Sequence, residues 1–198
     1  MTDLILASAS TARAGMLSAA GVAIETRPAR IDEEAIKAAM LSEGAPPRDI
    51  ADKLAELKAL RISGRTPGQM VLGADQVLVH DGALYSKAED MDQARAQLIR
   101  LRGTRHQLLS AAVIALDGEP IWRHVGQVRL TMRPFSDEFL DDYLERFGEL
   151  ALGSVGCYHL EGLGAQLFSR VEGDYFTVLG LPLLEVLGFL RARGILKE

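Results

Sequence analysis

The chain has 198 residues, a net charge of −5 and 48% hydrophobic residues, which is enough for one large domain or two small lobes that share a core. It carries no basic tail or Lys/Arg cluster, which argues against duplex nucleic acid as a partner, and no apolar run approaches the roughly 18 residues of a membrane span. The single cysteine, Cys157, excludes an internal disulfide, and the N-terminus lacks the pattern of a secretory signal, so we expect a protein of the reducing cytoplasm.

The first predicted strand, residues 4–7, leads into a loop of small and hydroxyl side chains that opens a helix at residues 8–13. A strand, a hydroxyl-rich loop, a helix N-terminus and an early arginine together favour an anion such as phosphate. The alternative is that Ser8 or Ser10 only caps the helix and that Arg13 lies in solvent.

A second strand is predicted over residues 22–30, and the acidic residues 32–34 follow it. Such a cluster is usual at a solvated helix start, but near a phosphate site its oxygens also suit Mg²⁺. Residues 48–62 are predicted to form a helix, with Lys58 at the edge of its apolar stripe. A lysine in that position commonly extends its amine to water.

The next predicted strand, residues 70–80, carries an acid and an amide, Asp75 and Gln76, between aliphatic residues. An ionised carboxylate removed from water is costly unless it is paired, bound to a metal or protonated. Apolar surroundings are also the usual means of tuning a carboxylate for catalysis. Two interpretations therefore stay open: a structural carboxylate at a strand end, or a catalytic acid or metal ligand.

The hairpin that follows returns Lys87 to the neighbourhood of this acid. A two-residue turn at Asp81-Gly82 would place Lys87 opposite Gln76, and a three-residue turn with a glycine bulge would place it opposite Asp75. An acid beside an ammonium group suits a site that handles phosphate and metal, and it equally suits a cross-strand ion pair.

The rest of the chain alternates between predicted helices and strands. His106 and His124 are expected to be polar residues on strand faces, because neither has a partner at metal-ligand spacing. Two hairpins within an alternating pattern favour a mixed sheet over a parallel one. The predicted elements are a helix after Asp90, a hairpin over 106–116 and 121–132, a helix after Ser136, strands over 166–171 and 176–179, and a helix from Pro182.

Several short motifs follow one another along the chain. They are Leu6-Ala7-Ser8-Ala9-Ser10 with Arg13, Lys58-Ala59, Gly73-Ala74-Asp75, Lys87, Gly148-Glu149, Glu161-Gly162-Leu163-Gly164, Gly173-Asp174-Tyr175 and Gly180-Leu181-Pro182-Leu183. In this order and spacing, the chain resembles the Maf family of nucleotide pyrophosphatases over nearly its whole length. The resemblance implies a single domain over residues 1–198, with an α/β fold similar to that of inosine triphosphatases: a mixed twisted sheet and two lobes around a central cleft.

The resemblance also implies an activity and a set of site residues. The activity is hydrolysis of a nucleoside triphosphate to a monophosphate and pyrophosphate, with a divalent cation such as Mg²⁺ or Mn²⁺, frequently in a homodimer. Asp75 corresponds to the family's proposed general base, and Glu33 lies near an acidic position early in the family's sequences. These two acids are also the expected metal ligands. The residues at phosphate-binding and catalytic positions are Ser8, Ser10, Arg13, Lys58, Asp75 and Lys87.

Some positions depart from the family's pattern without removing the acid or the lysines: Thr11, Ala12, Leu57, Ala88 and Ser154 stand where proline, arginine, glutamate, proline and lysine are usual.

Two other positions bear on the base of the nucleotide. Gln76 after the acid and Glu161 in the glycine-rich loop resemble the branch that acts on 7-methyl-GTP, whereas threonine and glutamine there resemble the branch that acts on dTTP and UTP. A carboxylate accepts the two adjacent N–H donors of guanine, and methylation at N7 makes the base cationic. Ala12 stands where the first branch often has a tryptophan and cannot stack on that base, for which Tyr158 is a candidate replacement.

The expected function is therefore that of a nucleoside triphosphate pyrophosphatase that favours 7-methyl-GTP or another modified nucleotide. Asp75 would deprotonate a water that attacks the α-phosphorus, while Arg13, Lys58, Lys87 and the cation neutralise the phosphate charge. The alternatives are a dTTP/UTP pyrophosphatase, an Asp75 that binds metal instead of acting as the base, and a regulatory nucleotide-binding protein without turnover.

Overall fold

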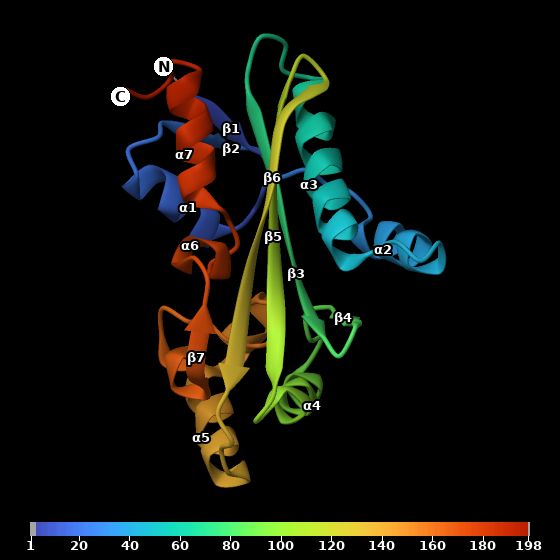
Figure 1. Cartoon of the computed structure of the whole chain (residues 1–198), viewed down its shortest axis with the longest axis vertical. Helices are drawn as coiled ribbons and strands as arrows, with labels where there is room; N and C mark the ends of the chain where they lie inside the picture. Colours follow the sequence, from blue (N-terminus) through green and yellow to red (C-terminus); the bar gives the residue numbers. More distant parts are fainter. Residues whose placement is uncertain (1–2, 198) are drawn as a thin grey trace. The chain divides into compact units, whose positions relative to one another are not determined.

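A computed structural model of the protein describes residues 3–197 and has an α/β architecture with a seven-stranded sheet (Figure 1). The strands are β1 (Leu4–Leu6), β2 (Ile24–Thr26), β3 (Val71–His80), β4 (Ala83–Tyr85), β5 (Arg105–Leu116), β6 (Glu119–Met132) and β7 (Phe168–Glu172). The α-helices are α1 (Thr11–Ala19), α2 (Glu33–Ser42), α3 (Pro47–Ser63), α4 (Met91–Leu101), α5 (Asp137–Phe147), α6 (Tyr175–Val178) and α7 (Leu183–Ala192). Two 3₁₀-helices, η1 (Gly148–Gly153) and η2 (Leu163–Leu167), complete the chain.

The sheet is mixed, as the sequence predicted. Its strand order is β2-β1-β3-β5-β6-β7, with β4 paired to β3 outside this path. Strand β1 runs parallel to β2 and β3, whereas β4 is antiparallel to β3 and β7 is antiparallel to β6. Among residues 3–197, none of the helices has the length and hydropathy that crossing a bilayer requires.

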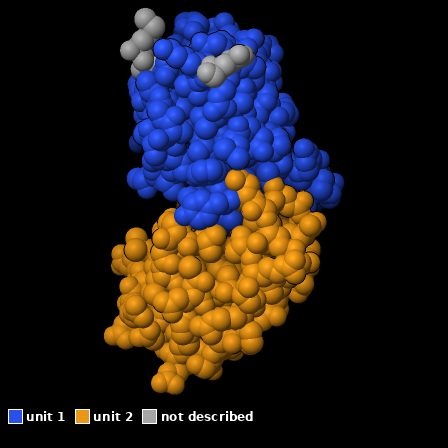
Figure 2. Space-filling model, turned by 60° about the vertical axis from the view of Figure 1, so that its left-hand side comes forward, with its two compact units in different colours: residues 1–76, 110–126, 175–198 blue, residues 77–109, 127–174 orange. Residues whose placement is uncertain are grey.

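The chain divides into two compact units, which Figure 2 shows in different colours. Unit 1 takes in residues 3–76, 110–126 and 175–197, and unit 2 takes in residues 77–109 and 127–174. Strands β3, β5 and β6 each begin in one unit and end in the other. The central cleft and the extent of a single domain stay predictions.

In unit 1, strand β3 alternates between two faces, each covered by helices (Figure 1). One face packs against α1 and α7 through apolar side chains, and the other packs against α3. Gly73 lies on the α3 face, where a Cβ atom would come within 2.1 Å of the Ala55 carbonyl oxygen and 2.6 Å of the Ala59 nitrogen. The helix therefore approaches this strand more closely than any side chain at position 73 would permit. The buried core on the first face consists of Leu4, Leu6, Met16, Leu17, Val22, Leu72, Ala74, Ala112, Ile114, Leu181, Leu183, Val186, Leu187 and Leu190.

The first hairpin uses a two-residue turn. Asp81 and Gly82 both have positive φ, 49° and 77°, as a type I′ turn requires, and His80 pairs with Ala83. Of the two registers that the sequence left open, the two-residue one is confirmed. Strand β4 ends at Tyr85, two residues before Lys87, so the ladder itself does not carry that lysine to β3.

Two sequence predictions were wrong in detail. Residues 176–179, predicted as a strand, lie largely in the short helix α6, which closes with a hydrogen bond from the Gly180 N–H to the Thr177 carbonyl. The predicted strand over 22–30 shrinks to the three residues of β2. His106 lies on strand β5, as predicted; it is buried, and its Nε2 lies 2.7 Å from the Tyr158 hydroxyl. His124 is half-buried and stacks on Trp122.

The close approach of α3 to β3 gives a test of this packing. We expect Gly73→Ala to lower the free energy of unfolding by about 1–3 kcal/mol or more, because backbone atoms of α3 occupy the space of the added methyl group. The matched control is Gly15→Ala in α1, where an added Cβ meets nothing within 4 Å. That change should stabilise the protein by about 0.5–1 kcal/mol, because alanine favours a helix interior over glycine.

Both variants are to be unfolded in urea and followed by circular dichroism. A Gly73→Ala midpoint at or above that of the unchanged protein would contradict the packing described for these two elements.

Candidate active site

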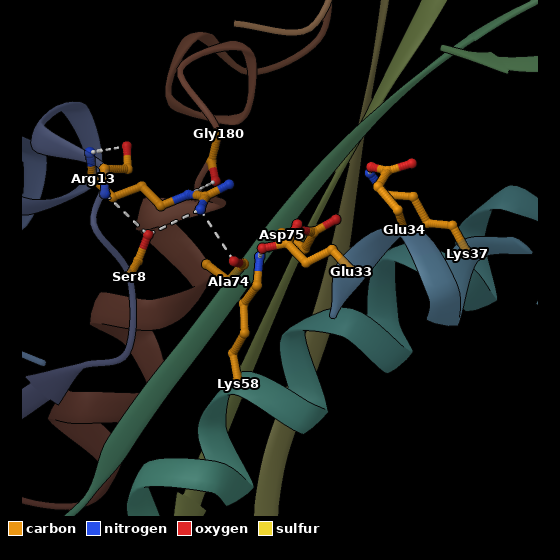
Figure 3. A network of polar contacts seen from close by, with 10 residues as sticks. Ser8, Arg13, Glu33, Glu34, Lys37, Lys58, Ala74, Asp75 and Gly180 are labelled. Carbon is orange, nitrogen blue, oxygen red and sulfur yellow. Dashed lines mark hydrogen bonds and ion pairs between the residues drawn. The ribbon is translucent and has the colours of Figure 1, made fainter. Parts of the chain in front are cut away.

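The centre of the candidate site is an ion pair between strand β3 and helix α3, both in unit 1 (Figure 3). Because side chains alternate along a strand, Asp75 shares the α3 face with Gly73 and meets Lys58 there. The Lys58 Nζ donates to Asp75 Oδ1 at 2.7 Å and lies 2.9 Å from Glu33 Oε1. Lys58 is 7% exposed and Asp75 is 5% exposed. The expectation that this lysine extends to water was therefore wrong, and the acid does not face solvent.

The second carboxylate oxygen of the acid has a different environment. Asp75 Oδ2 is buried and has no hydrogen-bond partner among the described residues. Burial raises the pKa of Asp75, and this effect outweighs the opposing charges of Lys58 and Arg13, while Glu33 raises the pKa further. A buried acceptor without a partner, on a carboxyl group with a raised pKa, is typical of a proton acceptor or a metal ligand.

The three acidic residues at the start of α2, residues 32–34, make different contacts. Asp32 caps the helix, since its Oδ1 accepts from the Ala35 N–H at 3.0 Å. Glu34 forms an ion pair with Lys37 on the same helix. Only Glu33 is directed to Lys58, and Figure 3 shows it beside Asp75. The interpretation as a helix start is therefore confirmed for Asp32, whereas Mg²⁺ binding by Glu33 stays a prediction.

Two carboxylates, Glu33 and Asp75, thus contact the same lysine amine. No group of three or more His, Cys, Asp or Glu side chains that could hold a metal occurs within residues 3–197. Mg²⁺ in nucleotide sites is commonly held by one or two carboxylates and completes its shell with phosphate oxygens and water. The unpartnered Asp75 Oδ2 together with Glu33 fits that mode of binding.

The hydroxyl-rich loop after β1 both caps α1 and holds an arginine. Ser10 is the N-cap, and its Oγ accepts from the Arg13 N–H at 3.3 Å. Ser8 Oγ accepts from the Ser10 N–H and from Arg13 Nη1, each at 3.2 Å. The capping role predicted as an alternative is confirmed for Ser10, but Arg13 does not lie free in solvent.

The guanidinium of Arg13 is anchored on two backbone segments. Its Nε donates to the Gly180 carbonyl at 2.8 Å, and its Nη1 donates to the Ala74 carbonyl at 3.0 Å (Figure 3). Burial lowers the pKa of Arg13, whereas the carboxylates of Asp75 and Glu33 raise it. An arginine remains protonated under such opposing influences, so the site holds a fixed cation next to the acid.

Gln76 is the neighbour of the acid and uses its amide as a donor. Its Nε2 lies 2.9 Å from Ser110 Oγ, 3.1 Å from the Thr177 carbonyl and 3.0 Å from the Val178 carbonyl. The sequence analysis did not identify Ser110 or Thr177 as part of this environment. The available signal was a hydroxyl residue inside the otherwise apolar run of residues 108–116.

The remaining predicted residues are Ala12, Lys87, Glu161 and Tyr158. Ala12 is exposed in the first turn of α1. Lys87 and Glu161 belong to unit 2, where both are exposed, the first between β4 and α4 and the second before η2. Tyr158 is buried against Phe168, so it belongs to a core and does not offer its ring to a nucleotide base. The structure brings Ser8, Ser10, Arg13, Glu33, Lys58, Asp75 and Gln76 together within unit 1.

Comparisons with known proteins agree with the sequence resemblance. The profile of the family described as Maf-like protein matches residues 3–193. A protein of Roseobacter denitrificans named nucleoside triphosphate pyrophosphatase is 60% identical over 191 residues, 96% of each chain. A protein of Caulobacter vibrioides with the same name is 55% identical over 196 residues, 99% of this chain and 98% of that one. A third, from a Ruegeria species, is 53% identical over 197 residues, 100% of this chain and 99% of its own.

The Lys58–Asp75 pair predicts a pH effect. Lys58 is the strongest influence that lowers the pKa of Asp75, so Lys58→Met should raise that pKa further above its ordinary value. The carboxyl group would then stay protonated to a higher pH than in the unchanged protein. The titration is to be followed by the ¹³C chemical shift of the Asp75 carboxyl carbon.

The control is Lys53→Met, the same change at an exposed lysine of α3 whose partner is Glu56. It should leave the Asp75 titration where it was. Equal midpoints in the two variants would show that Lys58 does not set the charge of the acid.

Proposed function

The chain belongs to the Maf-like protein family, and on that premise we propose that it is a nucleoside triphosphate pyrophosphatase, a hydrolase that yields a nucleoside monophosphate and pyrophosphate. The observation that supports this most directly is the buried carboxylate of Asp75. One of its oxygens is held by Lys58, the other has no partner among the described residues, and the Arg13 cation is close enough to influence its pKa.

In the proposed reaction, Asp75 is the general base. The hydrogen bond from Lys58 fixes Oδ1, so that Oδ2 accepts a proton from the water that attacks the α-phosphorus. The attack breaks the bond between that phosphorus and the bridging oxygen, and pyrophosphate leaves. A raised pKa makes the carboxylate a better proton acceptor near neutral pH than an ordinary aspartate is.

The cations of the site stabilise negative charge that develops on the phosphate oxygens. Arg13 and Lys58 lie on two sides of the acid in unit 1, and Lys87 is the third proposed contributor. Ser8, Ser10 and the N-terminus of α1 are proposed to bind a phosphate group through N–H and hydroxyl donors. Phosphoryl transfer depends mostly on positioning and electrostatics, so this small set of groups suffices.

A divalent cation, Mg²⁺ or Mn²⁺, is proposed to be held by Glu33 and the substrate's phosphates, with Oδ2 of Asp75 left to accept the proton. When bound, the cation supplies charge neutralisation and polarisation of a phosphate oxygen. Asp75 as a ligand instead of a base is the mechanistic rival.

The preferred substrate is proposed to be 7-methyl-GTP or another modified nucleotide, with dTTP or UTP as the alternative. Glu161 in the glycine-rich loop is exposed, so its carboxylate is accessible to accept hydrogen bonds from the N–H groups of guanine. The small side chain of Ala12 and the amide of Gln76 are proposed neighbours of the substrate. A homodimer stays a prediction from the resemblance.

The direct test is release of pyrophosphate from 7-methyl-GTP, GTP, dTTP and UTP with Mg²⁺, repeated with excess EDTA. Asp75→Asn should lower kcat by about 100-fold or more, because the amide cannot accept the proton. The fold should persist by circular dichroism. Asp49→Asn, at an exposed acid of α3, should keep full turnover as the control.

An Asp75→Asn variant with normal turnover would refute the role of Asp75. Nucleotide binding by the unchanged protein without pyrophosphate release would instead support the regulatory nucleotide-binding protein.

Glu161 gives a separate test of base preference. Glu161→Gln should reduce the ratio of kcat/KM for 7-methyl-GTP to that for dTTP by about 10-fold or more, because a charge-assisted hydrogen bond contributes roughly 1.5–3 kcal/mol. The control Glu145→Gln alters an exposed glutamate of α5 in the same unit and should leave the ratio unchanged. An unchanged ratio in Glu161→Gln would remove this residue from base recognition.

A further inference from the structure

In unit 1, hydrogen bonds and short chain segments form a ring that meets β3 at the two residues flanking Asp75. From β3, Gln76 Nε2 donates to the carbonyls of Thr177 and Val178 in α6. Just beyond that helix, the Gly180 carbonyl accepts from Arg13 Nε at 2.8 Å. The Nη1 of the same arginine returns to β3 at the Ala74 carbonyl. The ring therefore leaves the strand on one side of Asp75 and rejoins it on the other.

The turn that closes this ring, residues 177–180, is closely packed on two sides. Gly180 has a φ of +101°, and an added Cβ would lie 3.4 Å from Arg13 Nε. On the neighbouring strand β6, a Cβ at Gly126 would lie 2.8 Å from Thr177 Oγ1. The close approach of these two glycine positions holds the turn between β6 and the arginine.

Ser110 on β5 connects the ring to a second strand of the sheet through hydrogen bonds. It is fully buried, and the neighbouring residues along the strand are apolar. Its Oγ accepts from Gln76 Nε2 at 2.9 Å and donates to the Thr177 carbonyl at 2.7 Å. A buried hydroxyl without hydrogen-bond partners destabilises a protein, and the Ser110 hydroxyl has both an acceptor for its proton and a donor to its oxygen within the ring.

We propose that Ser110 is a positioning residue, which fixes the guanidinium of Arg13 beside Asp75 by holding Gln76 and the 177–180 turn. The inference rests on the proposed function for the role of Arg13 in binding phosphate. In the described part of the chain, protein acceptors engage Nε and Nη1 of Arg13, so Nη2 is the nitrogen left to donate to a phosphate oxygen. Its direction depends on the Gly180 carbonyl, and hence on the serine that holds the turn.

The test is a double-mutant cycle with Ser110→Ala and Arg13→Ala, measured as kcat/KM for the best substrate of the panel. Ser110→Ala should lower kcat/KM by about 10-fold, the equivalent of one hydrogen bond. If the serine acts through the arginine, the double variant should be no worse than Arg13→Ala alone. Losses that multiply in the double variant would overturn the proposal.

The matched control is Ser63→Ala, which also removes a hydroxyl from a buried serine of unit 1. Ser63 Oγ accepts from the Gly118 N–H at 3.0 Å and has no contact with the ring in the described structure. It should lower the thermal stability to an extent comparable with Ser110→Ala and leave kcat/KM unchanged. Equal kinetics in the two serine variants would reduce Ser110 to a structural residue and overturn the proposal.

A separate readout distinguishes this inference from the proposed function. Binding of inorganic triphosphate, measured by calorimetry, requires the phosphate-binding groups but no turnover. Ser110→Ala should weaken this binding by about 10-fold and Ser63→Ala should not. If the unchanged protein releases no pyrophosphate, the proposed function fails, while the binding data still decide the role of Ser110: equal affinity in Ser110→Ala and the unchanged protein would overturn it.

Discussion

The burial of one carboxylate on β3 determines the arrangement around it. An ionised Asp75 at 5% exposure is tolerated only with compensating cations, and Lys58 and Arg13 supply them. The approach of α3 that delivers Lys58 depends in turn on Gly73, because any side chain there would collide with the helix backbone. Gly73 and Asp75 therefore lie two residues apart on the same face of the strand. The glycine lets α3 come close, and the close helix brings Lys58 to the acid. Removing the glycine would displace the lysine, and the carboxylate would remain buried without its main partner.

Charge balance supports the proposal of a divalent cation. In unit 1 the positive charges of Arg13 and Lys58 are matched by the negative charges of Asp75 and Glu33, so the protein groups are neutral as a set. A triphosphate brings several further negative charges into a region of low dielectric constant, where like charges repel strongly. A divalent cation between the phosphates and Glu33 would offset that repulsion, and in the rival mechanism the unpartnered oxygen of Asp75 would be a further ligand for it.

The sequence predicted those features that depend on local chemistry. The Asp81-Gly82 turn, the cap at Ser10 and the mixed sheet follow from turn, capping and periodicity rules, and all are confirmed. Features decided by distant contacts were missed. Residues 176–179 have strand propensity but fold largely as α6, whose carbonyls are bound by side chains from β3 and β5. Ser110 was overlooked for the same reason, since only its partners distinguish it from any other strand serine. The joint action of Lys87 and Glu161 with the site remains a prediction.

At the start of α1, the observed capping leaves room for the phosphate binding proposed above. Of the first N–H groups of the helix, that of Arg13 is bound by Ser10 Oγ, and the N–H of Ser10 itself is bound by Ser8 Oγ. The N–H groups of Thr11 and Ala12 occupy the first helical positions, for which a helix provides no internal acceptor. They are the donors that the proposal assigns to a phosphate, and both residues are exposed. Backbone N–H donors at a helix start would contact phosphate and not the base, so under this proposal the discrimination between bases comes from other side chains.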